Sequence, residues 1–73
     1  MALSSVQITF VEHSGALMAA VAKFADGKSF KQTVSWDGGT VIDYDEEGLP
    51  LQVEFIGVPQ NLRWLYQLMK SRP

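Results

Sequence analysis

The sequence contains no cysteine and only one histidine, His13. The lack of thiols excludes disulfides, zinc–thiolate sites and iron–sulfur clusters, and a single histidine cannot form a multi-histidine metal site. A cysteine-free chain also suits a reducing compartment, so we expect a cytoplasmic protein. A domain of 73 residues buries only about 60% of its unfolded surface. Because disulfides are excluded, we expect a partner subunit to stabilise it.

Positive charge is also scarce, with 6 lysine and arginine residues against 8 acidic ones and a net charge of −2. The basic residues are scattered along the chain, which argues against nucleic-acid binding through a basic face. The first residues lack the positive n-region and apolar core of a signal peptide. The longest uncharged apolar stretch, residues 15–22, is far shorter than a membrane span. We therefore expect neither nucleic acid nor a membrane as a partner.

Hydrophobic residues make up 47% of the sequence, a value typical of globular domains. Alternation of apolar and polar residues predicts four β-strands. They cover residues 5–11, 29–36, 40–44 and 49–56. The segment 16–24 is ambiguous, because its composition suits a short helix that begins after Ser14, whereas an apolar run between turns suits a strand buried on both faces.

The clearest hairpin joins residues 40–44 to 49–56 through the loop 45–48. The predicted register places Tyr44 opposite Leu49, Ile42 opposite Leu51 and Thr40 opposite Val53. Gly48 directly precedes the second strand, where hairpin loops commonly require a residue with positive φ.

A helix is predicted at the C-terminus, with Pro59 in its first turn. Its apolar stripe has i, i+3, i+4, i+7 spacing and consists of Leu62, Leu65, Tyr66 and Met69. The predicted fold is a single α+β domain over residues 1–73. It has a four- or five-stranded antiparallel β-meander over 5–56 and one C-terminal helix over 59–71 packed on the sheet.

Acidic residues around the hairpin loop fall at positions 1, 3, 5 and 12 of a calcium-loop spacing, and are Asp43, Asp45, Glu47 and Glu54. The flanking residues alternate like strands, whereas this motif requires helices. In the predicted register Asp43 and Glu54 lie about 13 Å apart, too far to share an ion. These residues are weak metal candidates at most, and we expect no metal or other cofactor. His13 with Ser14 forms a surface turn, and no catalytic residue is predicted.

Two blocks of the sequence resemble a known family. The first is Ile8-Thr9-Phe10 followed by Ala16-Leu17, and the second is residues 41–48 followed by Val53-Glu54-Phe55-Ile56. They are similar to domain-of-unknown-function family 2283, a family of small uncharacterised bacterial proteins, over most of the chain. The resemblance implies a strand at 16–24. It implies no activity, although some relatives look like companions of small toxin-like proteins.

Three residues are candidates for an interface with another chain. Leu17 and Val21 belong to a segment that is apolar on both faces of a strand, and a single helix can cover only one face of the sheet. Trp64 lies off the helix's apolar stripe, whereas Trp36 and Tyr66 are expected in the core. We therefore predict a homo-oligomer, with a two-fold dimer as the default.

The predicted function is a non-enzymatic, self-associating protein-interaction module that also binds an unidentified protein. The alternatives are a small-ligand or metal-binding domain, a compact enzyme whose site is completed across subunits, and an antitoxin-like partner of a small toxin.

Overall fold

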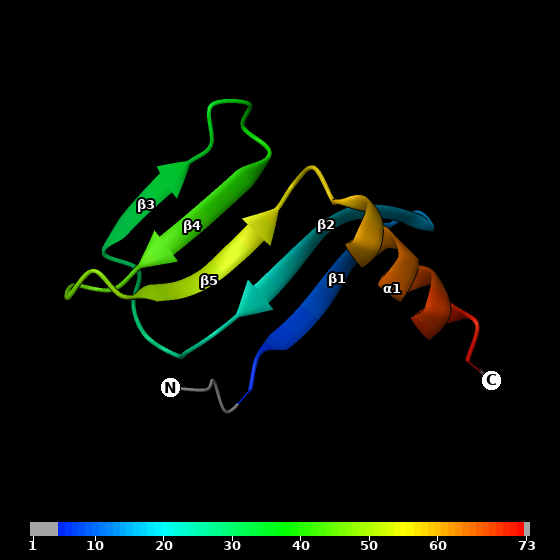
Figure 1. Ribbon diagram of the computed structural model, residues 1–73, viewed down its shortest axis with the longest axis horizontal. Coiled ribbons are helices and arrows are strands. Elements are labelled where there is room, and N and C mark those ends of the chain that lie inside the picture. The colour runs from blue at the N-terminus through cyan, green and yellow to red at the C-terminus, as the bar shows by residue number, and fades with distance from the viewer. Residues whose placement is uncertain (1–4, 73) are drawn as a thin grey trace.

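The computed structural model describes residues 5–72, which form one antiparallel sheet and one helix (Figure 1). The elements are β1 (Gln7–His13), β2 (Ala16–Lys23), β3 (Lys31–Val34), β4 (Thr40–Tyr44), β5 (Pro50–Phe55) and α1 (Gln60–Lys70). The predicted α+β class, with an antiparallel sheet and a C-terminal helix, is confirmed. The segment 16–24, for which the sequence allowed either a short helix or a strand, forms the strand β2.

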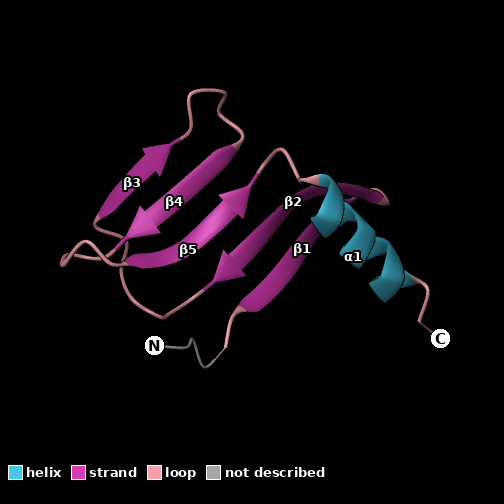
Figure 2. Ribbon diagram, viewed as in Figure 1, coloured by secondary structure: helices cyan, strands magenta, loops and turns pink. Residues whose placement is uncertain are grey.

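The strand order is β1-β2-β5-β4-β3, so the sheet departs from a simple meander (Figure 2). The last strand, β5, lies in the centre between β2 and β4. The chain after β2 therefore has to cross to the opposite edge before it forms β3. This order agrees with composition, because β2 is rich in apolar residues, whereas the edge strand β3 has four residues and begins with Lys31 and Gln32. A short, polar strand suits an edge.

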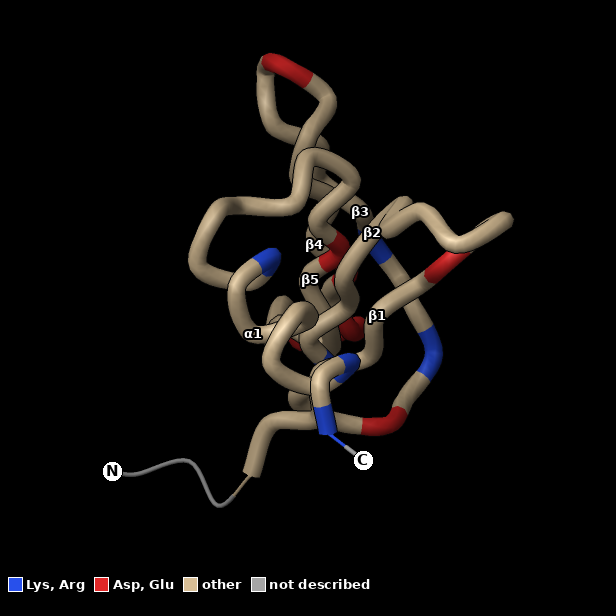
Figure 3. Tube along the Cα trace, turned by 90° about the vertical axis from the view of Figure 1, so that its right-hand side faces the viewer, with Lys and Arg blue, Asp and Glu red and all other residues tan. Residues whose placement is uncertain are grey.

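The two faces of the sheet differ in polarity. Residues directly opposite each other on neighbouring strands share a face, so the observed register assigns each side chain. The helix face is mostly apolar and carries Ile8, Phe10, Ala20, Ala22, Ile42, Val53 and Phe55. The far face is mixed, with Gln7, Thr9, Lys23, Gln32, Asp43, Gln52 and Glu54 beside the smaller apolar residues Val11, Ala19, Val21, Val34 and Val41. An edge-on view shows α1 to one side of the strands (Figure 3). The helix thus packs on the apolar face.

The core is thin. Its buried hydrophobic residues are Ala19, Ala20, Val41, Leu51, Val58 and Tyr66. No large side chain of residues 5–72 is completely buried, and only Ala20 has an exposed fraction of 0%. Figure 1 shows why, since α1 covers the β1–β2 end of the sheet and no helix covers β3 or β4.

The β4–β5 hairpin differs from its predicted register by two residues. Ile42 pairs with Val53, and Thr40 pairs with Phe55. The shift arises because Asp45 N–H donates to the Leu49 carbonyl and closes a three-residue loop, and a bulge follows next to Tyr44. Because the shift beyond the bulge is two residues, the predicted division into an apolar and a polar face holds for the pairs from Asp43–Gln52 to Thr40–Phe55. At the bulge itself Tyr44 lies opposite Pro50, which had been predicted on the other face.

Gly48 has the predicted positive φ, at 84°, and its N–H donates to the Asp45 carbonyl. A side chain at this position would meet no other atom within 4 Å, so any cost of a substitution comes from the backbone alone. We expect Gly48→Val to lower the free energy of unfolding by about 1–3 kcal/mol. Gly48→Asn should cost less, because asparagine tolerates left-handed φ. Urea unfolding measures both, and equal stability of the valine variant and the parent would contradict this.

Trp36 lies outside the core, contrary to the prediction. Its side chain is 98% exposed, at the turn between β3 and β4. The strand ends at Val34, and the Gly38 N–H donates to the Ser35 carbonyl, so the alternation that assigned Trp36 to a strand face stops before it.

The helix starts one residue later than predicted, after Pro59, which occupies the N-cap with extended φ and ψ. Of the predicted stripe, Tyr66 is buried and Leu62 is half-buried, whereas Met69 is 52% exposed. The stripe is therefore covered by the sheet only in part. Within residues 5–72, no helix has the length and hydrophobicity needed to cross a membrane.

Candidate functional site

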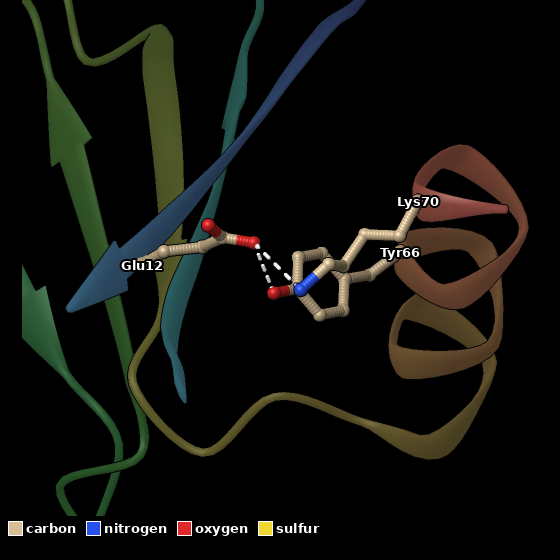
Figure 4. A network of polar contacts seen from close by, with 3 residues as sticks. All are labelled: Glu12, Tyr66 and Lys70. Carbon is tan, nitrogen blue, oxygen red and sulfur yellow. Dashed lines mark hydrogen bonds and ion pairs between the residues drawn. The ribbon is translucent and has the colours of Figure 1, made fainter. Parts of the chain in front are cut away.

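The second half of α1 is attached to the edge strand β1 by a polar network (Figure 4). The Tyr66 hydroxyl donates a hydrogen bond to the Glu12 Oε1 atom. The Lys70 Nζ atom lies 3.7 Å from the same oxygen and 5.4 Å from the centre of the Tyr66 ring. The Tyr66 ring also packs against Phe10, with the ring centres 5.4 Å apart. One tyrosine therefore fixes the helix to two residues of β1.

The network shifts the ionisation of its members. The hydrogen bond to Glu12 raises the pKa of Tyr66, because the carboxylate favours the protonated hydroxyl. The nearby oxygens of Tyr66 and Glu12 raise the pKa of Lys70, because they favour the ammonium form. Both shifts favour the arrangement in which the tyrosine is neutral and the lysine is charged.

A groove lies between the edge of the sheet and the overhanging helix. We call it the α1–β1 groove, and its lining residues are Ile8, Thr9, Phe10, Glu12, Tyr66, Met69 and Lys70. In Figure 1 the last turns of α1 lie on the outer side of β1. Within residues 5–72, no strand pairs with the outer edge of β1. The groove thus combines free backbone groups with apolar side chains.

A second hollow lies on the other side of α1, over the open part of the helix face. It is lined by Ile8, Ala20, Ala22, Phe55, Pro59, Asn61 and Leu62. Asn61 therefore borders the same hollow as Ile8 and Ala22. Trp64, Leu65 and Leu68 follow Asn61 at i+3, i+4 and i+7, so they lie on the same side of the helix. This side of the helix is exposed to solvent, and the exposed fraction of Trp64 is 63%. The helix thus has an exposed apolar flank that the sheet does not cover.

The predicted weak metal ligands hold structural positions. Both oxygens of Asp43 accept hydrogen bonds, Oδ1 from Ser29 and Gln32 and Oδ2 from Gln52. The bond from Gln32 is the largest cause of a lowered pKa at Asp43. Asp45 Oδ1 accepts from the N–H groups of residues 47 and 49 within the turn.

In the observed register Asp43 and Glu54 lie two residues apart on the far face, closer than predicted. Even so, no three acidic or histidine side chains gather at any metal-binding point within the described residues. His13, exposed at the end of β1, pairs with Ala16.

Because the oxygens of Asp43 and Asp45 already accept hydrogen bonds, we expect divalent metal to leave the stability unchanged. The melting temperature should be the same within a degree or two in excess EDTA and in millimolar calcium. Magnesium serves as the control for general ionic effects. A rise of several degrees with calcium alone would revive the calcium-loop interpretation.

The three predicted interface residues lie in different surroundings. Trp64 is on the exposed flank of α1. Val21 is half-buried on the far face, between Thr9 and Glu54 of the neighbouring strands. Leu17 is half-buried opposite Glu12, where a bulge interrupts the alternation of β2.

The sequence predicted the strand β1 but not its position at the edge of the sheet, although a signal existed. The strand β1 has the sequence QITFVEH, with no lysine or proline to prevent pairing with another strand. Comparison with protein-family profiles, curated proteins and solved structures found no significant match to this chain. The resemblance to family 2283 stays a prediction.

Proposed function

We propose that this chain is a non-enzymatic protein-interaction module that associates with itself. The observation that carries the proposal is the amount of exposed surface. The accessible area is 5742 Å², whereas a compact monomer of 8.1 kDa exposes about 4,500 Å². The radius of gyration is 13.5 Å, against about 11 Å for a compact chain of this length. The sheet is more open than a self-sufficient domain requires.

The extra surface is apolar in the regions described above. Exposed large hydrophobic residues occur in several parts of the molecule, and those of β1 and α1 are Ile8, Trp64, Leu65, Leu68 and Met69 on the helix side and Val11 on the far face. A contiguous apolar patch of more than a few hundred Å² is unusual on a soluble monomer and marks an interaction surface. A standard interface buries about 800 Å² on each partner, which is less than the excess of about 1,200 Å². The exposed surface is therefore large enough to supply a standard interface with a second copy of the chain.

The proposal includes a location in the cytoplasm, which the cysteine-free sequence supports. It also includes an unidentified protein as a second partner, because a surface of this kind can remain after two copies associate.

Sedimentation velocity over a range of micromolar concentrations tests self-association. We expect a species of twice the chain mass that dissociates on dilution. Trp64→Lys should weaken the association more than tenfold, because a large aromatic side chain at an interface contributes strongly to affinity. Gln67→Lys, on the polar side of the same helix, is the matched control and should leave it unchanged. A single species of one-chain mass at every concentration would rule out the proposal.

A further inference from the structure

We infer that the α1–β1 groove receives the β1 strand of a second copy, paired antiparallel, with Thr9 of both copies on the two-fold axis. This inference rests on the proposed self-association and assigns its geometry. The product is a continuous ten-stranded sheet with two helices on the same face.

The backbone of β1 favours the addition of a strand. It is seven residues long and lies at the edge of the sheet, so the N–H and C=O groups on its outer side have no partner strand in the part of the chain that the structure describes. The opposite edge, β3, has only four residues and carries Lys31, which protects an edge from pairing. Of the two edges, β1 is therefore the one suited to accept another strand.

The groove has the lining that an added strand requires. Consecutive residues Ile8, Thr9 and Phe10 line it on one side, and Met69 of the overhanging helix lines it on the other. A strand added at the usual spacing of about 4.8 Å from β1 would lie beneath the outer turns of α1. Its side chains on the helix face would then contact Met69, which is half exposed in the single chain.

The sequence of β1 is complementary to itself about Thr9. In this register Ile8 lies opposite Phe10 of the partner subunit, and Phe10 lies opposite the partner's Ile8. Aromatic and β-branched residues form favourable cross-strand pairs, and so do two threonines. The pairing repeats on both sides of the axis, as two-fold symmetry demands. The occupant that fits this groove is thus a second β1.

The position of the helix selects the register. Tyr66 contacts Phe10 and Glu12, so α1 crosses β1 about two residues from Thr9. With the axis at Thr9, the two helix axes lie about 13 Å apart, which leaves room for a layer of large side chains between them. An axis at Phe10 would bring them to about 7 Å, closer than helices pack, and an axis at Ile8 would separate them by about 20 Å.

This arrangement also covers the exposed flank of α1. The flank lies on the side of the helix that points toward Ile8, since Asn61 and Ile8 line the same hollow. Leu65, about 100° around the helix from Tyr66, would then meet the same residue of the partner's helix, and Trp64 and Leu68 would lie at the outer edge of this contact. The geometry therefore buries the backbone edge, the groove and the flank in a single contact.

A cysteine at position 9 tests the geometry, because the natural chain has no cysteine. Directly opposite residues of antiparallel strands have Cα atoms about 4.5–5.5 Å apart, within the range that a disulfide spans. We expect Thr9→Cys to form a disulfide-linked dimer in most of the protein under mild oxidation. Val11→Cys is the matched control, since it is also exposed on the far face of β1, but its two copies would lie about 13 Å apart and should not cross-link.

The outcomes separate this inference from the proposed function. A cross-link through residue 11 but not residue 9 would overturn the register. A protein that sediments as a dimer but cross-links through neither would overturn the edge pairing and leave self-association intact. Val21→Lys gives an independent readout, because it lies on the far face and should leave the dimer unchanged. If Val21→Lys dissociates the dimer, the interface lies on the far face and the edge pairing is wrong. A monomeric parent protein would refute both proposals.

Discussion

Replacing Tyr66 with alanine is expected to release α1 from the sheet and to lower the melting temperature by roughly 15 °C or more. Tyr66 is only 6% exposed, and it is the one buried residue of the helix. Its ring packs on Phe10 and its hydroxyl binds Glu12. An isolated helix of 11 residues is unstable in water, so α1 depends on this contact. Thermal melts followed by circular dichroism should show a loss of helical signal.

Two further variants separate the ring from the hydroxyl. Gln67→Ala removes an exposed residue on the polar side of the same helix and should change the melting temperature by only a few degrees. Tyr66→Phe keeps the packing on Phe10 but removes the hydrogen bond to Glu12, so its effect should fall between the other two. If Tyr66→Ala melts at the temperature of the parent, the helix is held by other contacts and the central role of this residue is wrong.

The stability that the contact of Tyr66 with Glu12 and Lys70 contributes should decrease at high pH. The folded protein raises the pKa of Tyr66 above 10.0 and that of Lys70 above 10.5. A raised pKa in the folded state means that the contribution is fully present below the unfolded value and is lost as pH rises through the folded value. The parent should therefore lose stability above about pH 10, and Tyr66→Phe should lose less over the same interval.

The sequence predicted the elements better than their arrangement. Alternation places strands wherever one face is buried and the other is solvated, so β1, β4 and β5 were identified from local pattern. Strand order was not predictable in this way, because the central position of β5 depends on pairs such as Ala22 with Val53, whose residues are far apart in the chain. Local propensity carries no information about such pairs.

The details of the turns and of the candidate site also could not be predicted from the sequence. The two-residue register shift depends on how Gly48 and Asp45 close the loop, and both loop lengths fit the same hydrophobic pattern. The role of Trp36 changed because its strand ended two residues earlier than the alternation suggested. The α1–β1 groove could not be predicted from the sequence, because it forms only where α1 crosses the edge of the sheet. The position of that crossing depends on the contact between Glu12 and Tyr66, which are 54 residues apart in the chain.

Replacing Ala20 with aspartate is expected to unfold the protein at neutral pH and 25 °C. Ala20 has no exposed surface and lies opposite Phe10 on β1 and Phe55 on β5, with Leu62 of the helix lining the same hollow. An ionised carboxylate enclosed by these side chains would lose its hydration without gaining a partner. The cost should exceed about 4 kcal/mol, and a domain of this size has a total stability of only about 4–11 kcal/mol.

The matched control is Ala16→Asp, the same substitution at an exposed position of the same strand, where the partner residue is His13. It should leave the circular dichroism spectrum and the melting temperature nearly unchanged.

Burial would raise the pKa of an aspartate at position 20 above the usual 3.9, so the loss of stability that it causes is small below about pH 4 and grows as pH rises through that value. The difference in stability between Ala20→Asp and the parent should therefore shrink in acid. Asp43 weakens the parent itself in that range, because its pKa is lowered in the folded state, and so the two proteins must be compared at each pH. A folded Ala20→Asp variant at neutral pH, with a melting temperature close to that of the parent, would mean that α1 does not cover β2 at this position.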